Sequence, residues 1–205
     1  MTESAIALGQ PRTASYCPLP GVPDEMVAPD GRIRPLWRKL VAHLDALSDD
    51  DLTRDLSRAD RHLLDSGVFY RQYGKGESVE RPWPLSHIPV LLAEDDWTRI
   101  SRALMQRADL LEAMMADLYG PNDLVASGRL PALLVAGNPE WLRPMVGVKP
   151  RGGHFLHFLA FELGRGPDGQ WWVLADRTQA PSGAGYALEN RQIVSRALPE
   201  PVSRS

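Results

Sequence analysis

The sequence is poor in cysteine and in long apolar runs, and each shortage excludes a class of protein. Cys17 is the only cysteine among 205 residues, which excludes an intrachain disulfide and a cysteine-based zinc site. No apolar run approaches the roughly 20 residues that a membrane-spanning helix requires. The first residues lack the basic and apolar stretches of a secretory signal. We therefore expect a cytoplasmic protein with no membrane partner.

Lysine is also scarce, since Lys39, Lys75 and Lys149 are the only lysines among 23 basic residues. An excess of arginine can indicate recognition of carboxylates or phosphates, but a biased genome composition explains it more simply. A formal net charge of −3 and an isoelectric point near 6.0 give no reason to expect a nucleic-acid partner. The length suggests one domain with or without a small appendage, and 43% hydrophobic residues can form its core.

The helices expected from the sequence all precede its final hairpin. Residues 1–30 are rich in proline, glycine and small polar residues, and we expect an extended, partly disordered arm there. After it we expect a helix from Pro35 to Leu47. A second helix begins at a capping box of Ser48 and Asp51 and ends near Gly67. The other expected elements are a strand at 68–73, a loop at 74–89, a helix at 95–119, a short helix at 122–127 and a strand at 133–136. Because helices precede the final hairpin, the pattern favours an α+β fold with N-terminal helices packed on an antiparallel sheet.

The stretch from 154 to 191 carries most of the chemistry in the sequence. Residues 155–163 are almost continuously apolar, which predicts a strand covered on both faces. The Pro-Asp-Gly sequence at 167–169 is typical of a three-residue hairpin loop whose glycine takes a positive φ. Residues 171–176 then form the returning strand, so the sequence predicts a β-hairpin at this point.

The predicted turn fixes a register in which Gly166 pairs with Gln170. Glu162 then lies opposite Leu174, and Asp176 is its diagonal neighbour, about 7–8 Å away between Cα atoms. Two carboxylates that converge from adjacent strands suit Mg²⁺, which binds one or two carboxylates together with substrate phosphates. From spacing alone, acids that simply end strands in water are the favoured interpretation. Glu162 weighs against it because it interrupts an apolar run.

A glycine-rich loop is expected after the second strand. Gly183 and Gly185 permit close approach of the backbone to an anion, although such a stretch is more often only a connection. Neither the P-loop motif nor the dinucleotide-binding glycine motif is present. Glu189, Asn190 and Arg191 then place an acid, an amide and a guanidinium within one short segment.

Other candidate sites are weaker. His154 and His157 would point to opposite faces of a strand, so they cannot bind one metal together. Ser182 lies on a glycine-flanked loop, but APSGAG lacks the GxSxG pattern that places the nucleophile of many hydrolases. The residues therefore give no support to a hydrolase.

The run ADRTQAPSGAGYALENR resembles the circularly permuted ATP-grasp proteins of the glutathionylspermidine-synthase-like group, type 2. Further similar segments are PDEMVAPDGRIRPLW, GVFYRQYG, RPWPL, IPVLL, QRADLLEAMMADLYGP, NPEWLRP and WWVL. Together they cover roughly residues 18–200. The resemblance implies an ATP- and Mg²⁺-dependent ligase that joins a small-molecule or peptide carboxylate to an amine through an acyl phosphate.

The resemblance also implies roles for individual residues. ATP-grasp proteins carry an acid on one strand and a Glu-x-Asn element on the next; Glu162 falls at the acid, Leu174 at the Glu and Asp176 at the Asn. Glu189 would supply the acid that is missing at Leu174. The implied metal ligands are therefore Glu162, Asp176 and Glu189. The implied nucleotide contacts are Ser182, Gly183, Gly185 and Asn190. The implied catalytic residues, which would contact phosphate or acyl phosphate, are Arg177 and Arg191.

Members of this family continue well past the ENR segment. We therefore expect residues 31–200 to form the N-terminal part of a permuted ATP-grasp domain, truncated after residue 200 and inactive as an isolated chain. Its expected partner is a complementing C-terminal half. The alternative is a non-catalytic fragment or interaction module that needs a partner.

Overall fold

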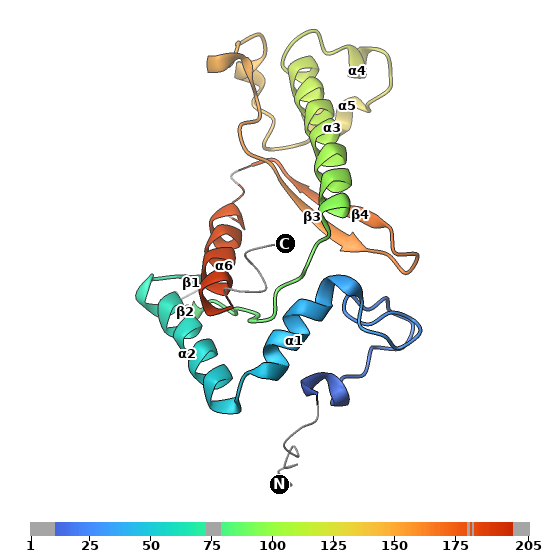
Figure 1. The fold of residues 1–205 in the computed structure, drawn as a ribbon. Coiled ribbons are helices and arrows are strands. Elements are labelled where there is room, and N and C mark those ends of the chain that lie inside the picture. Colours follow the sequence, from blue (N-terminus) through green and yellow to red (C-terminus); the bar gives the residue numbers. More distant parts are fainter. Residues whose placement is uncertain (1–10, 73–78, 180, 182, 199–205) are drawn as a thin grey trace. The chain divides into compact units, whose positions relative to one another are not determined.

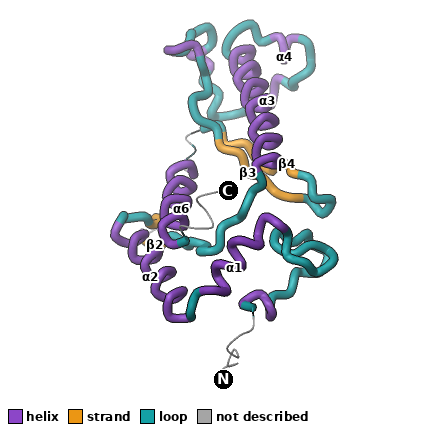
Figure 2. The backbone as a smooth tube through the Cα atoms, in the orientation of Figure 1, coloured by secondary structure: helices purple, strands orange, loops and turns teal. Residues whose placement is uncertain are grey.

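The computed structural model describes residues 11–72, 79–179, 181 and 183–198, which are mainly helix and loop with short strands (Figure 2). The chain divides into two compact units. Unit 1 comprises residues 1–96, 165–172 and 182–205, and unit 2 comprises residues 97–164 and 173–181. None of the described helices is long and apolar enough to cross a membrane. The residues predicted to form one site are therefore divided between two units.

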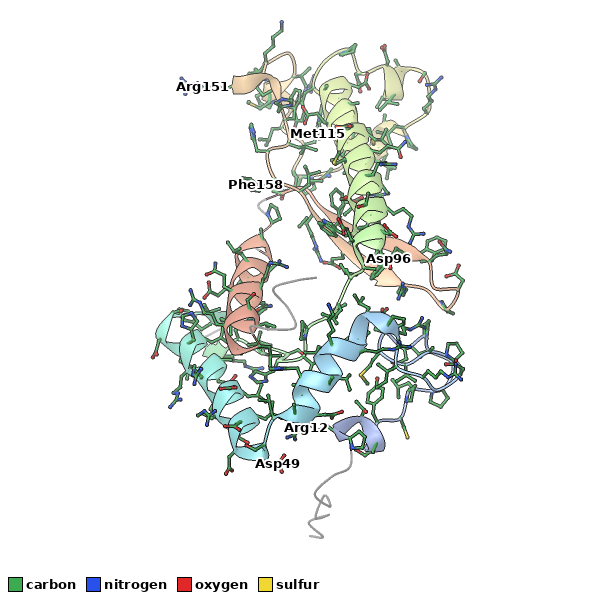
Figure 3. All side chains as sticks on the ribbon, viewed as in Figure 1. Arg12, Asp49, Asp96, Met115, Arg151 and Phe158 are labelled. Atoms are coloured by element: carbon green, nitrogen blue, oxygen red, sulfur yellow. The ribbon has the colours of Figure 1, made fainter. Side chains whose placement is uncertain are left out.

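Unit 1 is assembled mainly from helices that are far apart in the sequence. Its elements are η1 (Arg12–Ser15), η2 (Pro35–Trp37), α1 (Arg38–Ala46), α2 (Asp49–Asp65), β1 (Phe69–Gln72), β2 (Val79–Pro82) and α6 (Gly183–Ala197) (Figure 1). The N-terminal segment is tied to this unit by Arg12, whose Nη1 lies 2.7 Å from Asp49 Oδ1 (Figure 3). The expected arm at 1–30 thus contains a short helix, and residues 1–10 lie outside the described part of the chain.

The buried cluster of unit 1 lies between helices. Leu40 of α1 and Ile193 of α6 are each 1% exposed, and Leu63 of α2 is 4% exposed. All three belong to one apolar cluster together with Trp37 and Leu198. Two-stranded sheets of this size cannot form a core alone. In the described part of unit 1 helices therefore pack on one another, which differs from the helices on a sheet that the sequence favoured.

Ser48 caps α2 as the sequence predicted. The backbone N–H of Asp51 donates to Ser48 Oγ at 3.1 Å, and the Ser48 hydroxyl donates to Asp51 Oδ2 at 2.7 Å. The Ser48 hydroxyl, together with Arg54, lowers the pKa of Asp51 below its ordinary 3.8. A carboxyl with a lowered pKa stabilises the fold above its ordinary pKa, and this contribution is lost as the pH falls through the folded-state value.

Replacing Ser48 with alanine is expected to destabilise the protein by about 0.5–2 kcal/mol, the usual range for loss of a helix cap. The pKa of Asp51 should rise toward 3.8 because its main hydrogen-bond donor is gone. Thermal unfolding near neutral pH measures the first effect, and an NMR titration of Asp51 measures the second. Ser48→Thr should restore most of both, whereas an unchanged Asp51 titration in Ser48→Ala would contradict the assignment.

The predicted loop at 74–89 is wrong over Val79–Pro82, which forms β2. This strand pairs antiparallel with β1, from Phe69 opposite Pro82 to Gln72 opposite Val79. Pro82 lies at the end of the ladder, where its missing N–H leaves few bonds unmade. Residues 73–78 lie outside the described residues. Pro82 therefore lies at the end of the strand without preventing it.

The remaining elements are α3 (Glu94–Leu118), α4 (Asp123–Ala126), α5 (Ala132–Ala136), η3 (Arg143–Met145), η4 (Arg151–Gly153), β3 (Ala160–Arg165) and β4 (Trp171–Arg177). The predicted helices at 95–119 and 122–127 correspond to α3 and α4. The strand predicted at 133–136 is wrong, because these residues belong to α5. A short apolar run fits a helix and a strand equally well, so its periodicity could not decide.

β3 and β4 form an antiparallel hairpin with the predicted turn. The N–H of Gly166 donates to the carbonyl of Gln170 at 2.8 Å, and Gly169 has a φ of 75°. The Leu174 side chain lies over Gly164, where a Cβ atom would come within 2.9 Å of it. Both residues thus share a face, as the predicted register requires.

The first strand of this hairpin is shorter than predicted, beginning at Ala160 instead of Phe155. The backbone N–H groups of Phe155 and Leu156 donate to the carboxylate of Glu112 on α3, each at 2.9 Å. Their hydrogen bonds are therefore satisfied by a side chain, and no strand ladder is needed there.

Candidate functional site

Two carboxylates of unit 2 lie on adjacent strands of the hairpin, as the sequence predicted. Glu162 is on β3 and Asp176 is on β4. Arg177 Nε and Nη2 donate to Glu162 Oε1 at 2.9 and 2.6 Å. Arg177, predicted as a catalytic residue, is thus held by the acid predicted as a metal ligand. The two side chains are 62% and 51% exposed, so solvent screens this pair.

Asp176 is held by a second arginine, Arg107, in a bidentate pair. Arg107 Nε donates to Oδ1 and Nη2 donates to Oδ2, both at 2.7 Å. The hydrogen bond from Arg107 lowers the pKa of Asp176 below its ordinary 3.8, and Asp176 raises the pKa of Arg107. The pair joins α3 to β4, so it fixes the orientation of the Asp176 carboxylate.

Arg107 is a residue that sequence reasoning missed. It lies 69 positions from Asp176, and no local spacing rule connects residues that far apart. The available signal was its place in QRADLLEAMMADLYGP, one of the segments that resemble the ATP-grasp family. That resemblance marked the segment without giving any one of its residues a role.

The second group of predicted residues lies on α6 in unit 1. Asn190 Oδ1 accepts a hydrogen bond from Trp83 Nε1 at 2.8 Å, and the Trp83 ring stacks on Tyr186 with centroids 4.2 Å apart. Glu189 Oε1 lies 3.8 Å from His62 Nε2 of α2. Arg191 is exposed. Asn190 and Glu189 therefore contribute to fastening α6 within its unit.

The glycine-rich loop expected before Glu189 is partly a helix. Gly183 and Gly185 lie in the first turn of α6, are exposed, and have open space where a side chain would project. Ser182 lies outside the described residues. Backbone N–H groups in the first turn of a helix have no intrahelical partner. The two glycines can therefore still donate to an anion, from a helix end instead of a loop.

The predicted metal ligands are divided between the two units. Glu162 and Asp176 belong to unit 2, whereas Glu189 belongs to unit 1. Across residues 11–72, 79–179, 181 and 183–198, no three His, Cys, Asp or Glu side chains gather as a metal site. The two hairpin carboxylates have the donor chemistry that Mg²⁺ requires. The three-residue ligand set remains a prediction.

A cavity of about 660 Å³ opens beside the C-terminal half of α3. Leu110 and Met114 of α3 and Leu124 of α4 form part of its apolar wall, and Arg129 lies at its polar side. None of the predicted site residues lines it. The hairpin carboxylates are therefore set apart from this cavity.

A mixed α and β chain with a carboxylate-bearing antiparallel hairpin is consistent with part of an ATP-grasp domain. The comparison of sequences gives the family plainly: the chain belongs to the circularly permuted ATP-grasp type 2 proteins, whose family model matches residues 89–205. The resemblance inferred from the ADRTQAPSGAGYALENR run is confirmed.

Relatives of the chain are considerably longer than it is. An uncharacterised protein of Synechocystis is 33% identical over 177 residues, which are 86% of this chain and 37% of that protein. One from Mycobacterium tuberculosis is 35% identical over 185 residues, covering 86% and 21%. A Frankia casuarinae protein with a provisional glutamate–cysteine ligase name is 34% identical over 177 residues, covering 86% and 20%. The chain thus spans between a fifth and somewhat over a third of these relatives.

Proposed function

We propose that this chain supplies part of the active site of an ATP- and Mg²⁺-dependent ligase that joins a carboxylate to an amine through an acyl phosphate. The observation that carries the proposal is the hairpin of an ATP-grasp family member with Glu162 and Asp176 on adjacent strands, each aligned by an arginine. Carboxylates that bind metals are commonly oriented by such outer hydrogen bonds.

Glu162 and Asp176, with Glu189, would hold the metal in this proposal. Mg²⁺ neutralises charge on the phosphates during phosphoryl transfer. Arg107 keeps the Asp176 carboxylate in one orientation, because its two donors fix both oxygens. Each carboxylate oxygen has more than one acceptor site, so an arginine bond and a metal contact are compatible.

The remaining predicted residues would contact the nucleotide and the transferred phosphate. Arg177 and Arg191 carry the guanidinium groups that grip phosphate oxygens in pairs. Arg177 already donates to Glu162, so phosphate would compete with that carboxylate for it. The Oδ1 atom of Asn190 accepts from Trp83, which leaves its amide nitrogen for the nucleotide. Ser182, Gly183 and Gly185 would supply further donors ahead of and within the first turn of α6.

The substrates in this proposal are a small-molecule or peptide carboxylate and an amine. The provisional name of the Frankia casuarinae relative is that of a glutamate–cysteine ligase. We extend only the substrate classes to this chain. A complementing segment that corresponds to the rest of the longer relatives would complete the site.

A non-catalytic interaction module is the second candidate. It is favoured by the fact that Glu162 and Asp176 are each neutralised by an arginine. Paired charges of this kind can serve structure alone. The two candidates differ in whether the chain recognises Mg²⁺ together with a nucleotide.

Calorimetric titration of residues 1–205 with AMP-PNP separates the two candidates. We expect binding in the presence of Mg²⁺ and an affinity at least about tenfold lower with EDTA, because the metal links carboxylates to phosphates. We expect no sustained ATP hydrolysis by this chain. Absence of binding with or without Mg²⁺ would favour the interaction module. Robust hydrolysis that Asp176→Ala abolishes would show instead that the chain holds a complete site.

A further inference from the structure

A loop of unit 2, residues 142–154, is closed at its base by one aromatic side chain. Trp141 precedes the loop and Phe155 follows it, and both rings stack on Tyr119, with centroids 6.5 and 5.7 Å from it. The two ends of the loop are therefore held near the same point. We refer to residues 142–154 as the Tyr119 loop.

Backbone hydrogen bonds fix the same loop further. The N–H of Leu142 donates to the Tyr119 hydroxyl at 3.1 Å, and the N–H of Gly147 donates to the Tyr119 carbonyl at 2.7 Å. The Glu112 carboxylate accepts from Phe155 just beyond the loop. Compact surface loops with joined ends are frequently functional. The Tyr119 loop is thus a defined scaffold for the side chains that it carries.

Three of those side chains carry a permanent positive charge. The sequence has no acidic residue between Glu140 and Glu162, although the whole chain is net negative. Arg143, Lys149 and Arg151 lie on the loop and are exposed. Among the described residues, none of these three side chains has an ion-pair or hydrogen-bond partner. Figure 3 shows Arg151 at the outer edge of the loop.

The acids that flank the loop do not neutralise these cations. Glu140 accepts from Gln179 Nε2 at 3.0 Å, and Glu162 accepts from Arg177. Glu112 is occupied by backbone donors and lies 3.9 Å from His154 Nδ1. Like charges on one short loop repel each other, so binding of a multiply charged anion would lower the electrostatic energy of the loop.

We propose that the Tyr119 loop binds the phosphate groups of a small-molecule polyphosphate through Arg143, Lys149 and Arg151. Guanidinium groups bind phosphate oxygens in pairs, and the lysine ammonium acts as a compact charge. Gly152 has open space where a side chain would project, which lets an anion approach the backbone. The inference rests on the proposed function only in taking that polyphosphate to be ATP.

Titration of residues 1–205 with inorganic tripolyphosphate tests the loop directly. Lys149→Gln combined with Arg151→Gln should weaken binding about tenfold or more, because charge-assisted contacts are lost. The matched control combines Arg102→Gln with Arg129→Gln, two exposed arginines of unit 2 outside the loop. It removes the same charge and should change the affinity by less than about twofold. Circular dichroism establishes that all variants remain folded.

Three results would overturn the proposal: no binding of tripolyphosphate to the unaltered chain, equal weakening by both double variants, or tighter binding of a short DNA duplex than of tripolyphosphate. Repeating the titration with Mg²⁺ and AMP-PNP separates the loop from the proposed ligase function. Loop-dependent binding of tripolyphosphate without binding of the nucleotide would support the loop and contradict the ligase site.

Discussion

Ile193→Ala is expected to lower the free energy of unfolding of unit 1 by about 2–5 kcal/mol, the range for truncating a fully buried aliphatic side chain. Ile193 is 1% exposed and lies in the cluster that Leu40 and Leu63 also form. The truncation leaves a cavity between α6 and α2, because a close-packed core relaxes only in part. Since proteins of this size are only marginally stable, the loss is a large share of the total.

Leu188→Ala is the matched control for this substitution because it lies on the same helix and is 58% exposed. It should change the stability by no more than about 0.5 kcal/mol. Urea unfolding measures the free energy of unfolding of both variants, and hydrogen exchange of the α6 amides measures the local stability of that helix. Equal effects of the two substitutions would contradict the helical core. Weaker docking of α6 would also disorder Glu189, Asn190 and Arg191 without altering any of them.

Local chemistry explains the parts of the fold that could be predicted. The hydroxyl of Ser48 sets the start of α2, and the Pro-Asp-Gly turn sets the hairpin and places Gly169 at a φ of 75°. Each of these two features depends on residues within four positions of one another, so the local sequence is enough to predict it. The placement of Glu162 and Asp176 on adjacent strands follows from that turn, which is why this half of the candidate site was predictable.

Contacts over long distances in the sequence account for the rest. The Arg107 pair with Asp176 spans 69 positions, and no periodicity encodes it. The glycine-rich stretch at Gly183 and Gly185 permits either a loop or a helix. It is helical here because the residues that follow, such as Ile193, bury an apolar face. Tertiary packing thus outweighed the poor helix propensity of the two glycines.

Asp176→Asn is expected to weaken binding of Mg²⁺ and AMP-PNP by about 100-fold or more, since loss of a metal ligand should exceed the 10–100-fold cost of losing an outer partner. Asparagine is isosteric and still accepts one hydrogen bond from Arg107, so the hairpin should remain folded. Arg107→Gln should weaken the same binding by a smaller factor, because it keeps the carboxylate and removes only its alignment. Calorimetry on the chain gives both affinities.

The order of these two effects distinguishes a metal ligand from a structural ion pair. If Asp176 serves only to hold α3 against β4, then Arg107→Gln should lower the thermal stability at least as much as Asp176→Asn, and neither should alter nucleotide binding. Asp109→Asn controls for the loss of one exposed acid on α3. If Asp176 binds metal, its substitution weakens nucleotide binding only when Mg²⁺ is present, whereas its ion pair with Arg107 depends on no metal.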